Sequence, residues 1–126
     1  MIKNYQRQQL QMDFSTGMGN DHPSDIDMFY MANQNGLPVL ILGEIKNEHG
    51  TFGKGQRKVL QQVADNFRHR ALIIYITHNK RIEEGATKVD VMNCPVSEIY
   101  ENGKWQTPSC KVTVKRFIDL IKKGQI

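Results

Sequence analysis

The spacing of apolar and polar residues changes along this 126-residue chain, and the changes predict alternating strands and helices. Residues 26–32 and 37–46 have the composition of two strands, rich in bulky apolar side chains. Asn33-Gln34-Asn35-Gly36 lies between them and contains the Asn-Gly pair that favours a tight hairpin turn. We therefore expect an antiparallel hairpin near the start of the fold.

The second of these strands is expected in the middle of its sheet. Val39, Leu40, Ile41 and Leu42 follow one another without polar alternation, as in a strand that is covered on both faces. Pro38 lies at its start, where a missing backbone donor does least harm.

A helix and a third strand are expected next. From Gln56 onward apolar residues recur at helical spacing, and residues 71–77 form a continuous β-branched run typical of a buried strand. Strand, helix and strand over residues 37–77 form the pattern of a right-handed parallel crossover. The predicted apolar face of the helix comprises Val59, Leu60, Val63, Ala64 and Phe67.

The remaining segments complete a single α/β domain over residues 1–126, a mixed sheet flanked by helices. We expect a short amphipathic helix at 1–13 and short edge strands at 89–93 and 96–100. A C-terminal helix is expected to end at Gly124. Its predicted buried residues are Val114, Phe117, Ile118 and Ile121.

Composition fits a globular domain, with 39% hydrophobic and 24% charged residues. No apolar run approaches the roughly 20 residues that cross a bilayer, and the first residues do not resemble a signal peptide. We therefore expect a cytoplasmic protein with no membrane partner. Cys94 and Cys110 are expected to be two unrelated free thiols.

Charge is distributed unevenly along the chain. The net charge is +4, but residues 1–53 hold six acidic and three basic residues, whereas residues 54–126 hold seven acidic and fourteen basic residues. An early acidic cluster with a later basic excess suits a metal site beside a surface that binds a polyanion. Chance asymmetry in a small protein explains the distribution equally well.

Three charged residues of the hairpin carry the strongest chemical signal. Glu44 and Lys46 lie two residues apart at the end of an apolar strand, so both point to one face. Pairing around Asn35-Gly36 places Asp27 opposite residue 44. Two carboxylates held close repel each other unless a cation lies between them, and hard oxygen ligands suit Mg²⁺ or Mn²⁺. The alternative is a plain salt bridge at a strand end.

Ser24-Asp25-Ile26-Asp27, followed by a hairpin and Glu44-Ile45-Lys46, resembles the PD-(D/E)XK nuclease superfamily. Gln56 extends the likeness to the superfamily's virus-type replication-repair modules. The chain resembles those modules or the superfamily's Holliday-junction-resolvase-like members most. The resemblance covers residues 24–77 and implies a restriction-endonuclease-like core. It also implies a DNA-cutting hydrolase with Mg²⁺ or Mn²⁺ as cofactor.

The resemblance assigns a role to each matching residue. Asp27, Glu44 and the Ile45 carbonyl would hold the metal, Lys46 would assist the attacking water, and Gln56 would position the group. Lys54, Arg57 and Lys58 are candidates for contacts with the DNA backbone.

The sequence departs from the superfamily's pattern at two places. No Glu is present in residues 1–13, so Gln9, Asp13 or a water would take the place of the carboxylate that the N-terminal helix usually supplies. Asp25 competes with Asp27, and we prefer Asp27 because it lies further into the strand; Asp25 is then an accessory residue.

Three functions follow in order of preference. The first is a structure-directed nuclease of DNA recombination, repair or phage and mobile-element processing, acting as a homodimer where both strands must be cut. The second is a non-catalytic DNA-binding module on the same fold. The third is an interaction protein in which Glu44 and Lys46 merely pair.

Overall fold

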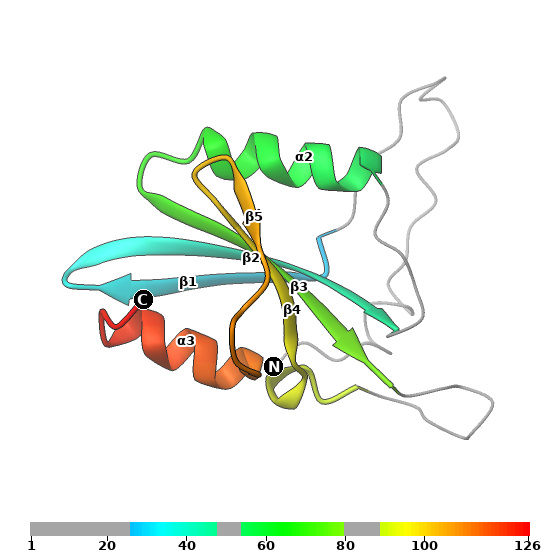
Figure 1. Cartoon of the computed structure of the whole chain (residues 1–126). Helices are drawn as coiled ribbons and strands as arrows, with labels where there is room; N and C mark the ends of the chain where they lie inside the picture. The colour runs from blue at the N-terminus through cyan, green and yellow to red at the C-terminus, as the bar shows by residue number, and fades with distance from the viewer. Residues whose placement is uncertain (1–25, 48–53, 80–88) are drawn as a thin grey trace.

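The computed structural model describes residues 26–47, 54–79 and 89–126. They form three layers, with a five-stranded mixed sheet between two helices (Figure 1). The strands lie in the spatial order β1–β2–β3–β4–β5. The expected α/β class, a mixed sheet flanked by helices, is confirmed. The helix expected at 1–13 lies outside the described residues, as does the loop of residues 80–88.

The predicted hairpin is present. Strands β1 (Met28–Gln34) and β2 (Leu37–Asn47) pair antiparallel around a two-residue turn, in which Asn35 and Gly36 have φ angles of 54° and 84°. Positive φ at both positions is what such a turn needs and what Asn-Gly supplies at little cost. Because the turn uses only two residues, β1 continues to Gln34 and is displaced from the expected range of 26–32.

The parallel unit is also present. Helix α2 (Lys54–Asp65) connects β2 to β3 (Arg70–His78), and the two strands pair in parallel with Glu44 beside Tyr75. Strand β2 lies between β1 and β3, as its uninterrupted apolar run predicts.

The expectation for residues 89–93 is wrong, because they contain a short 3-10 helix, η2 (Val91–Asn93), instead of a strand. The Asn93 amide donates to the Asp90 carboxylate at 2.7 Å, and the Cys94 N–H donates to the Val91 carbonyl at 3.0 Å. These local bonds close a turn, which competes with an extended backbone.

Strands β4 (Val96–Glu101) and β5 (Lys104–Gln106) form a second hairpin through Asn102 and Gly103, both at positive φ. Strand β4 is paired on both sides, with β3 and with β5, so the expectation of an edge strand at 96–100 is also wrong. Strand β5 forms that edge of the sheet.

The C-terminal helix α3 (Val114–Lys122) agrees with the prediction. The Thr113 hydroxyl accepts the Arg116 N–H and caps the first turn, and Gly124 follows the last turn with a φ of 68°. The four apolar residues expected to be buried are buried.

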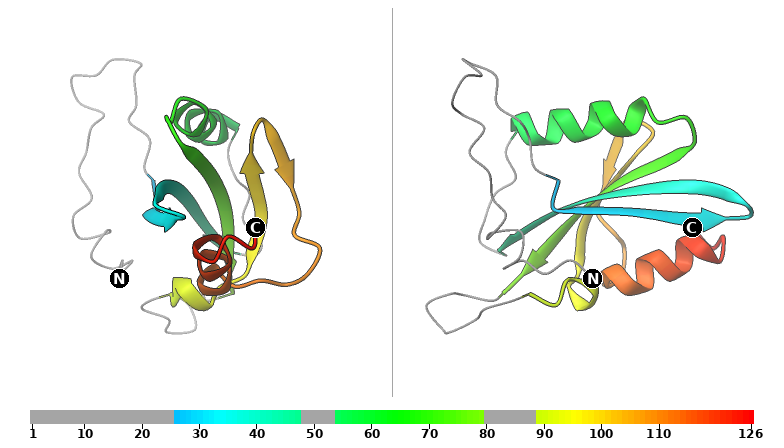
Figure 2. Two further views of the ribbon diagram at one scale, coloured as in Figure 1. Left: turned by 90° about the vertical axis from the view of Figure 1, so that its left-hand side faces the viewer. Right: turned by 180° about the vertical axis from the view of Figure 1, so that it is seen from behind.

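Each face of the sheet has its own core, because α2 covers one face and α3 the other (Figure 2). We call these the α2 face and the α3 face. Even-numbered residues of β2 point to the α2 face and odd-numbered residues to the α3 face. The α2 core contains Leu40, Leu42, Leu60, Ala64, Ile73, Tyr75 and Tyr100.

Helix α2 is rotated from the orientation expected from its apolar pattern. Leu60 and Ala64 are buried, but Val59 and Val63 are 37% and 41% exposed. Arg57, expected on the outer side, is half-buried against the sheet.

Gly43 allows β1 and β2 to approach closely next to the candidate site. A Cβ atom at Gly43 would lie 2.9 Å from the Cβ of Met28, whereas one at Gly55 in α2 would meet nothing within 4 Å. We expect Gly43→Ala to lower the free energy of unfolding by about 1–3 kcal/mol, the usual cost of overpacking. Gly55→Ala should raise it by up to about 1 kcal/mol, because alanine favours the helix. Urea unfolding measures both; a neutral Gly43→Ala would contradict the close approach.

Candidate functional site

Asp27 and Glu44 are the only polar or charged residues that are buried in the described part of the chain. Glu44 is 0% exposed and Asp27 is 7% exposed. Met28 and Gly43 form the last pair of the β1–β2 ladder, so Asp27 and Glu44 each lie one residue beyond that pair, at the same end of the hairpin. Burying a carboxylate is costly unless its charge is compensated, so two buried carboxylates at one end of a hairpin are an unusual feature.

Asp27 departs from simple strand alternation. It lies one residue before β1, and its Oδ2 atom accepts the backbone N–H of Ile45 at 2.9 Å. The Asp27 carboxylate therefore accepts the hydrogen bond that a backbone carbonyl would accept if β1 continued one step further along β2. The N–H and C=O of one residue in an antiparallel strand point to the same neighbour, so the Ile45 carbonyl is directed to the side on which Asp27 lies.

Lys46 and Gln56 belong to the α2 face, as Glu44 does. Lys46 lies two residues beyond Glu44 in β2, which places both side chains on this face. Gln56 is half-buried in the first turn of α2. At 100° per residue it lies on the opposite side of Leu60 from Arg57, so it faces β1 and β2 while Arg57 faces β3 to β5.

Tyr75 and Arg57 extend this polar region across the sheet. Glu44 pairs with Tyr75 and Tyr75 with Glu98, so the three lie in one row across β2, β3 and β4. The Arg57 Nε donates to the Tyr75 hydroxyl at 3.2 Å, and the Arg57 Nη2 lies 3.8 Å from a Glu98 carboxylate oxygen. The guanidinium carbon lies 4.5 Å from the ring centroid of Trp105.

Sequence reasoning identified neither Tyr75 nor Trp105 as part of this region. The signal available for Tyr75 was a hydroxyl in an otherwise aliphatic run, on the strand predicted to lie parallel to β2. Trp105 had no such signal, because β5 is only three residues long and its pairing depends on the β4 hairpin.

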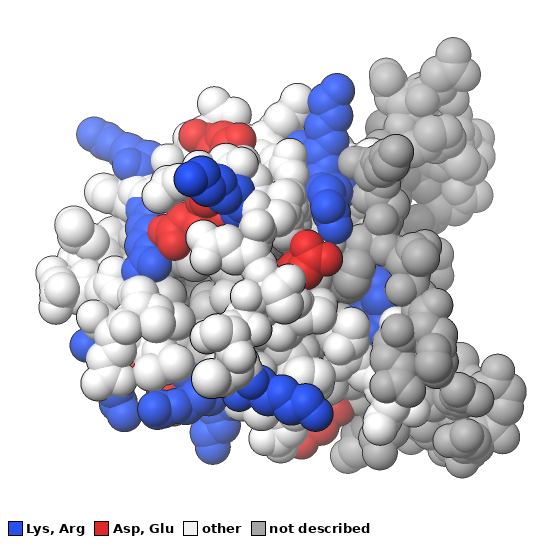
Figure 3. All heavy atoms as spheres, in the orientation of Figure 1, with Lys and Arg blue, Asp and Glu red and all other residues white. Residues whose placement is uncertain are grey.

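The remaining predicted site residues are only partly covered by the structure. Gln9, Asp13 and Asp25 lie outside the described residues. Lys54 begins α2, but its side chain is likewise outside them. Lys58 is exposed on the helix. In Figure 3 basic side chains lie near both helices and alternate with acidic ones, without forming one continuous basic stripe in that view.

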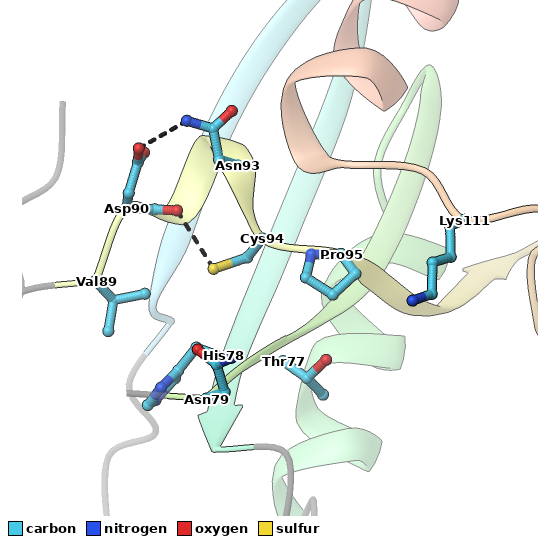
Figure 4. A pocket seen from close by; sticks show the side chains of 9 residues that line it. All are labelled: Thr77, His78, Asn79, Val89, Asp90, Asn93, Cys94, Pro95 and Lys111. Carbon is cyan, nitrogen blue, oxygen red and sulfur yellow. Dashed lines mark hydrogen bonds between the residues drawn. The ribbon is translucent and has the colours of Figure 1, made fainter. Parts of the chain in front are cut away.

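Two hollows lie close to the ends of the strands. One of about 410 Å³ borders Asp27 and is lined mainly by apolar residues, among them Tyr30, Ile45 and Met92, on the α3 face. The other, of about 490 Å³, lies at the end of β3 (Figure 4). It is lined by Thr77, His78, Asn79, Val89, Asp90, Asn93, Cys94, Pro95 and Lys111.

Three residues that line the second hollow, Asp90, Asn93 and Cys94, hydrogen-bond to one another. The Cys94 Sγ donates to the Asp90 carbonyl at 3.3 Å, and Asp90 also accepts from Asn93, so these residues stabilise η2. Cys94 and Cys110 form no disulfide, as expected.

Comparisons with protein-family models, with curated proteins and with solved structures found no match for this chain. Within the described residues, no group of three or more His, Cys, Asp or Glu is arranged to hold a metal ion. The candidate ligands Asp27, Glu44 and the Ile45 carbonyl include only two residues of these types, so they do not form a group of that size. No described helix is long and apolar enough to span a membrane.

Burial raises the pKa of Tyr75, and the nearby carboxylates Glu44 and Glu98 raise it further, against the opposing effect of Arg57. A tyrosine in the unfolded chain has a pKa of about 10. The folded protein therefore retains this proton to a higher pH than the unfolded chain does. The stabilising contribution of the neutral phenol is complete below about pH 10 and is lost as the pH rises through the folded pKa.

We expect the free energy of unfolding to fall above about pH 10, and Tyr75→Phe to make that fall less steep because it removes the group that titrates. Denaturant unfolding at a series of pH values between about 8 and 11 measures the slope. An unchanged slope in Tyr75→Phe would show that this phenol does not contribute.

Proposed function

We propose that this protein is a metal-dependent nuclease of the PD-(D/E)XK type that hydrolyses phosphodiester bonds of DNA. The observation that carries the proposal is the burial of two acidic residues, Asp27 and Glu44, at the same end of the first hairpin. The order of the residues supports it: Asp27 directly precedes β1, Glu44-Ile45-Lys46 lies in β2, and the following helix supplies Gln56.

The donor set fits Mg²⁺ or Mn²⁺. Asp27 and Glu44 supply carboxylate oxygens, and the Ile45 carbonyl is directed to the side of β2 on which Asp27 lies. All are hard oxygen ligands, which these cations prefer to nitrogen or sulfur. When bound, such an ion supplies Lewis-acid stabilisation of phosphate charge and an activated water.

Lys46 and Gln56 have roles that follow from their positions. The Lys46 ammonium, on the same face as Glu44, would orient the attacking water and offset negative charge on the phosphate. The Gln56 amide, half-buried at the start of α2, can both donate and accept hydrogen bonds and would hold Lys46 or a water in place.

The type of DNA follows from the resemblance. The resemblance to Holliday-junction-resolvase-like members favours recognition of DNA structure, such as junctions, flaps or ends. A homodimer would present two sites where both strands are cut. Recombination, repair or the processing of phage and mobile-element DNA are the settings that the resemblance favours.

The first test is cleavage of linear, nicked, branched and single-stranded DNA with Mg²⁺, with Mn²⁺ and with chelator. We expect cleavage only with metal. Glu44→Gln and Asp27→Asn should lower the rate at least about a hundredfold, since even residues that only support a metal ligand contribute about 10–100-fold. Asp119→Asn on α3, at the opposite face, is the matched control and should cleave like the unaltered protein.

Metal binding is tested separately by thermal unfolding. At a metal concentration about a hundred times the dissociation constant, the native state should gain about 2.7 kcal/mol, and Glu44→Gln should abolish the gain. Salt-dependent DNA binding without metal-dependent cleavage would replace the nuclease with a non-catalytic DNA-binding module. Absence of both would leave an interaction protein.

A further inference from the structure

Arg57 is held in one orientation by groups from two strands. Its Nε donates to the Tyr75 hydroxyl, and its guanidinium carbon lies 4.5 Å from the Trp105 centroid and 5.2 Å from the Tyr75 centroid. Arginine stacks on aromatic rings through its planar, weakly hydrated cation. A side chain fixed in this way has already lost most of the rotamer freedom that binding a ligand would otherwise cost.

Most of the donors of this guanidinium remain available. It has five N–H groups, and within the described residues only the Nε–H makes a hydrogen bond, which leaves four on the two terminal nitrogens. The Glu98 oxygen at 3.8 Å from Nη2 is beyond hydrogen-bond distance. With the two side chains 35% and 36% exposed, this ion pair is screened by solvent and offsets the charge only weakly.

The position of Arg57 relates it to the proposed metal site. Tyr75, which accepts its hydrogen bond, lies directly beside Glu44 on the neighbouring strand, and both point to the α2 face. Arg57 and Gln56 leave the first turn of α2 on opposite sides of Leu60. A polyanion that reached Glu44 would therefore pass a fixed cation one strand away.

We propose that Arg57 is a phosphate-binding residue, positioned by Tyr75 and Trp105 to hold the nucleic-acid backbone beside Glu44. The inference rests on the proposed function for the identity of the ligand. The paired terminal N–H groups of arginine match two oxygens of a phosphate, a geometry that lysine does not reproduce. Arg57 thereby differs from exposed Lys58, which offers a charge without a fixed direction.

The test is binding of a fluorescent duplex and a fluorescent single strand to the full chain in chelator, measured by anisotropy over a range of salt concentrations. Arg57→Gln should weaken binding about tenfold and reduce the slope of log affinity against log salt by about one, because one phosphate contact is lost. Arg57→Lys should restore most of the slope but not the affinity. Lys115→Gln on α3 removes the same charge at the opposite face and should leave both unchanged.

Tyr75→Phe tests the positioning itself, since it removes the hydroxyl and keeps the ring. It should give an affinity between those of the unaltered protein and Arg57→Gln, at a temperature where circular dichroism shows every variant folded. A purely structural Arg57 would lower the melting temperature of Arg57→Gln and leave affinity and salt slope unchanged, which would overturn the inference.

The two proposals fail in different ways. Equal DNA binding by the unaltered protein and both Arg57 variants, with metal-dependent cleavage intact, would overturn only the role of Arg57. Arg57-dependent binding without cleavage in any metal would overturn the nuclease and keep the phosphate contact. No binding by the unaltered protein would overturn the phosphate contact, whatever the cleavage assay showed.

Discussion

The burial of two carboxylates is the constraint on which the rest of this structure depends. Asp27 and Glu44 lie at the open end of the first hairpin, where each is withdrawn from water. A buried charge needs a compensating charge or hydrogen bonds. The Asp27 carboxylate accepts one hydrogen bond from the Ile45 N–H. Evolution rarely keeps an arrangement of this kind for stability alone, since apolar residues of similar volume would often serve better.

The sheet supports this pair from several directions. The Asn35-Gly36 turn fixes the register, and Gly43 allows Met28 to pack closely against β2 next to the two acids in sequence. Away from the site, the Arg70 guanidinium binds both oxygens of Glu101 and also contacts the Ile126 carbonyl. These contacts connect the start of β3 and the end of β4 to the C-terminus. The two strands that carry Tyr75 and Glu98 are therefore fixed at the end away from the candidate site.

The hairpin was predictable because its information is local. Asn35-Gly36 specifies the turn, the turn specifies the register, and the register brings Asp27 and Glu44 to the same end of the hairpin. The apolar run of β2 and the face of α3 were predictable for a similar reason, since burial leaves a direct periodic trace in the sequence.

The rotation of α2 was not predictable, because it depends on distant aromatic residues. Arg57 can turn inward only where Tyr75 and Trp105 offer their rings, and this inward turn leaves Val59 and Val63 exposed. The 3-10 helix at Val91–Asn93 was missed for another reason: hydrogen bonds between Asp90, Asn93 and Cys94 outweigh the β-propensity of the valines.

The two cores of the described fold are unequal, and the difference bears on how the molecule fluctuates. Thirteen buried residues form the core beneath α3, but only seven form the core beneath α2. Less apolar area holds α2 than holds α3, so α2 should detach at a lower free energy than global unfolding requires. Gln56 and Arg57 belong to this less stable layer, while Glu44 belongs to the sheet. Within the described residues, the helix that carries Gln56 and Arg57 is therefore the less firmly held of the two.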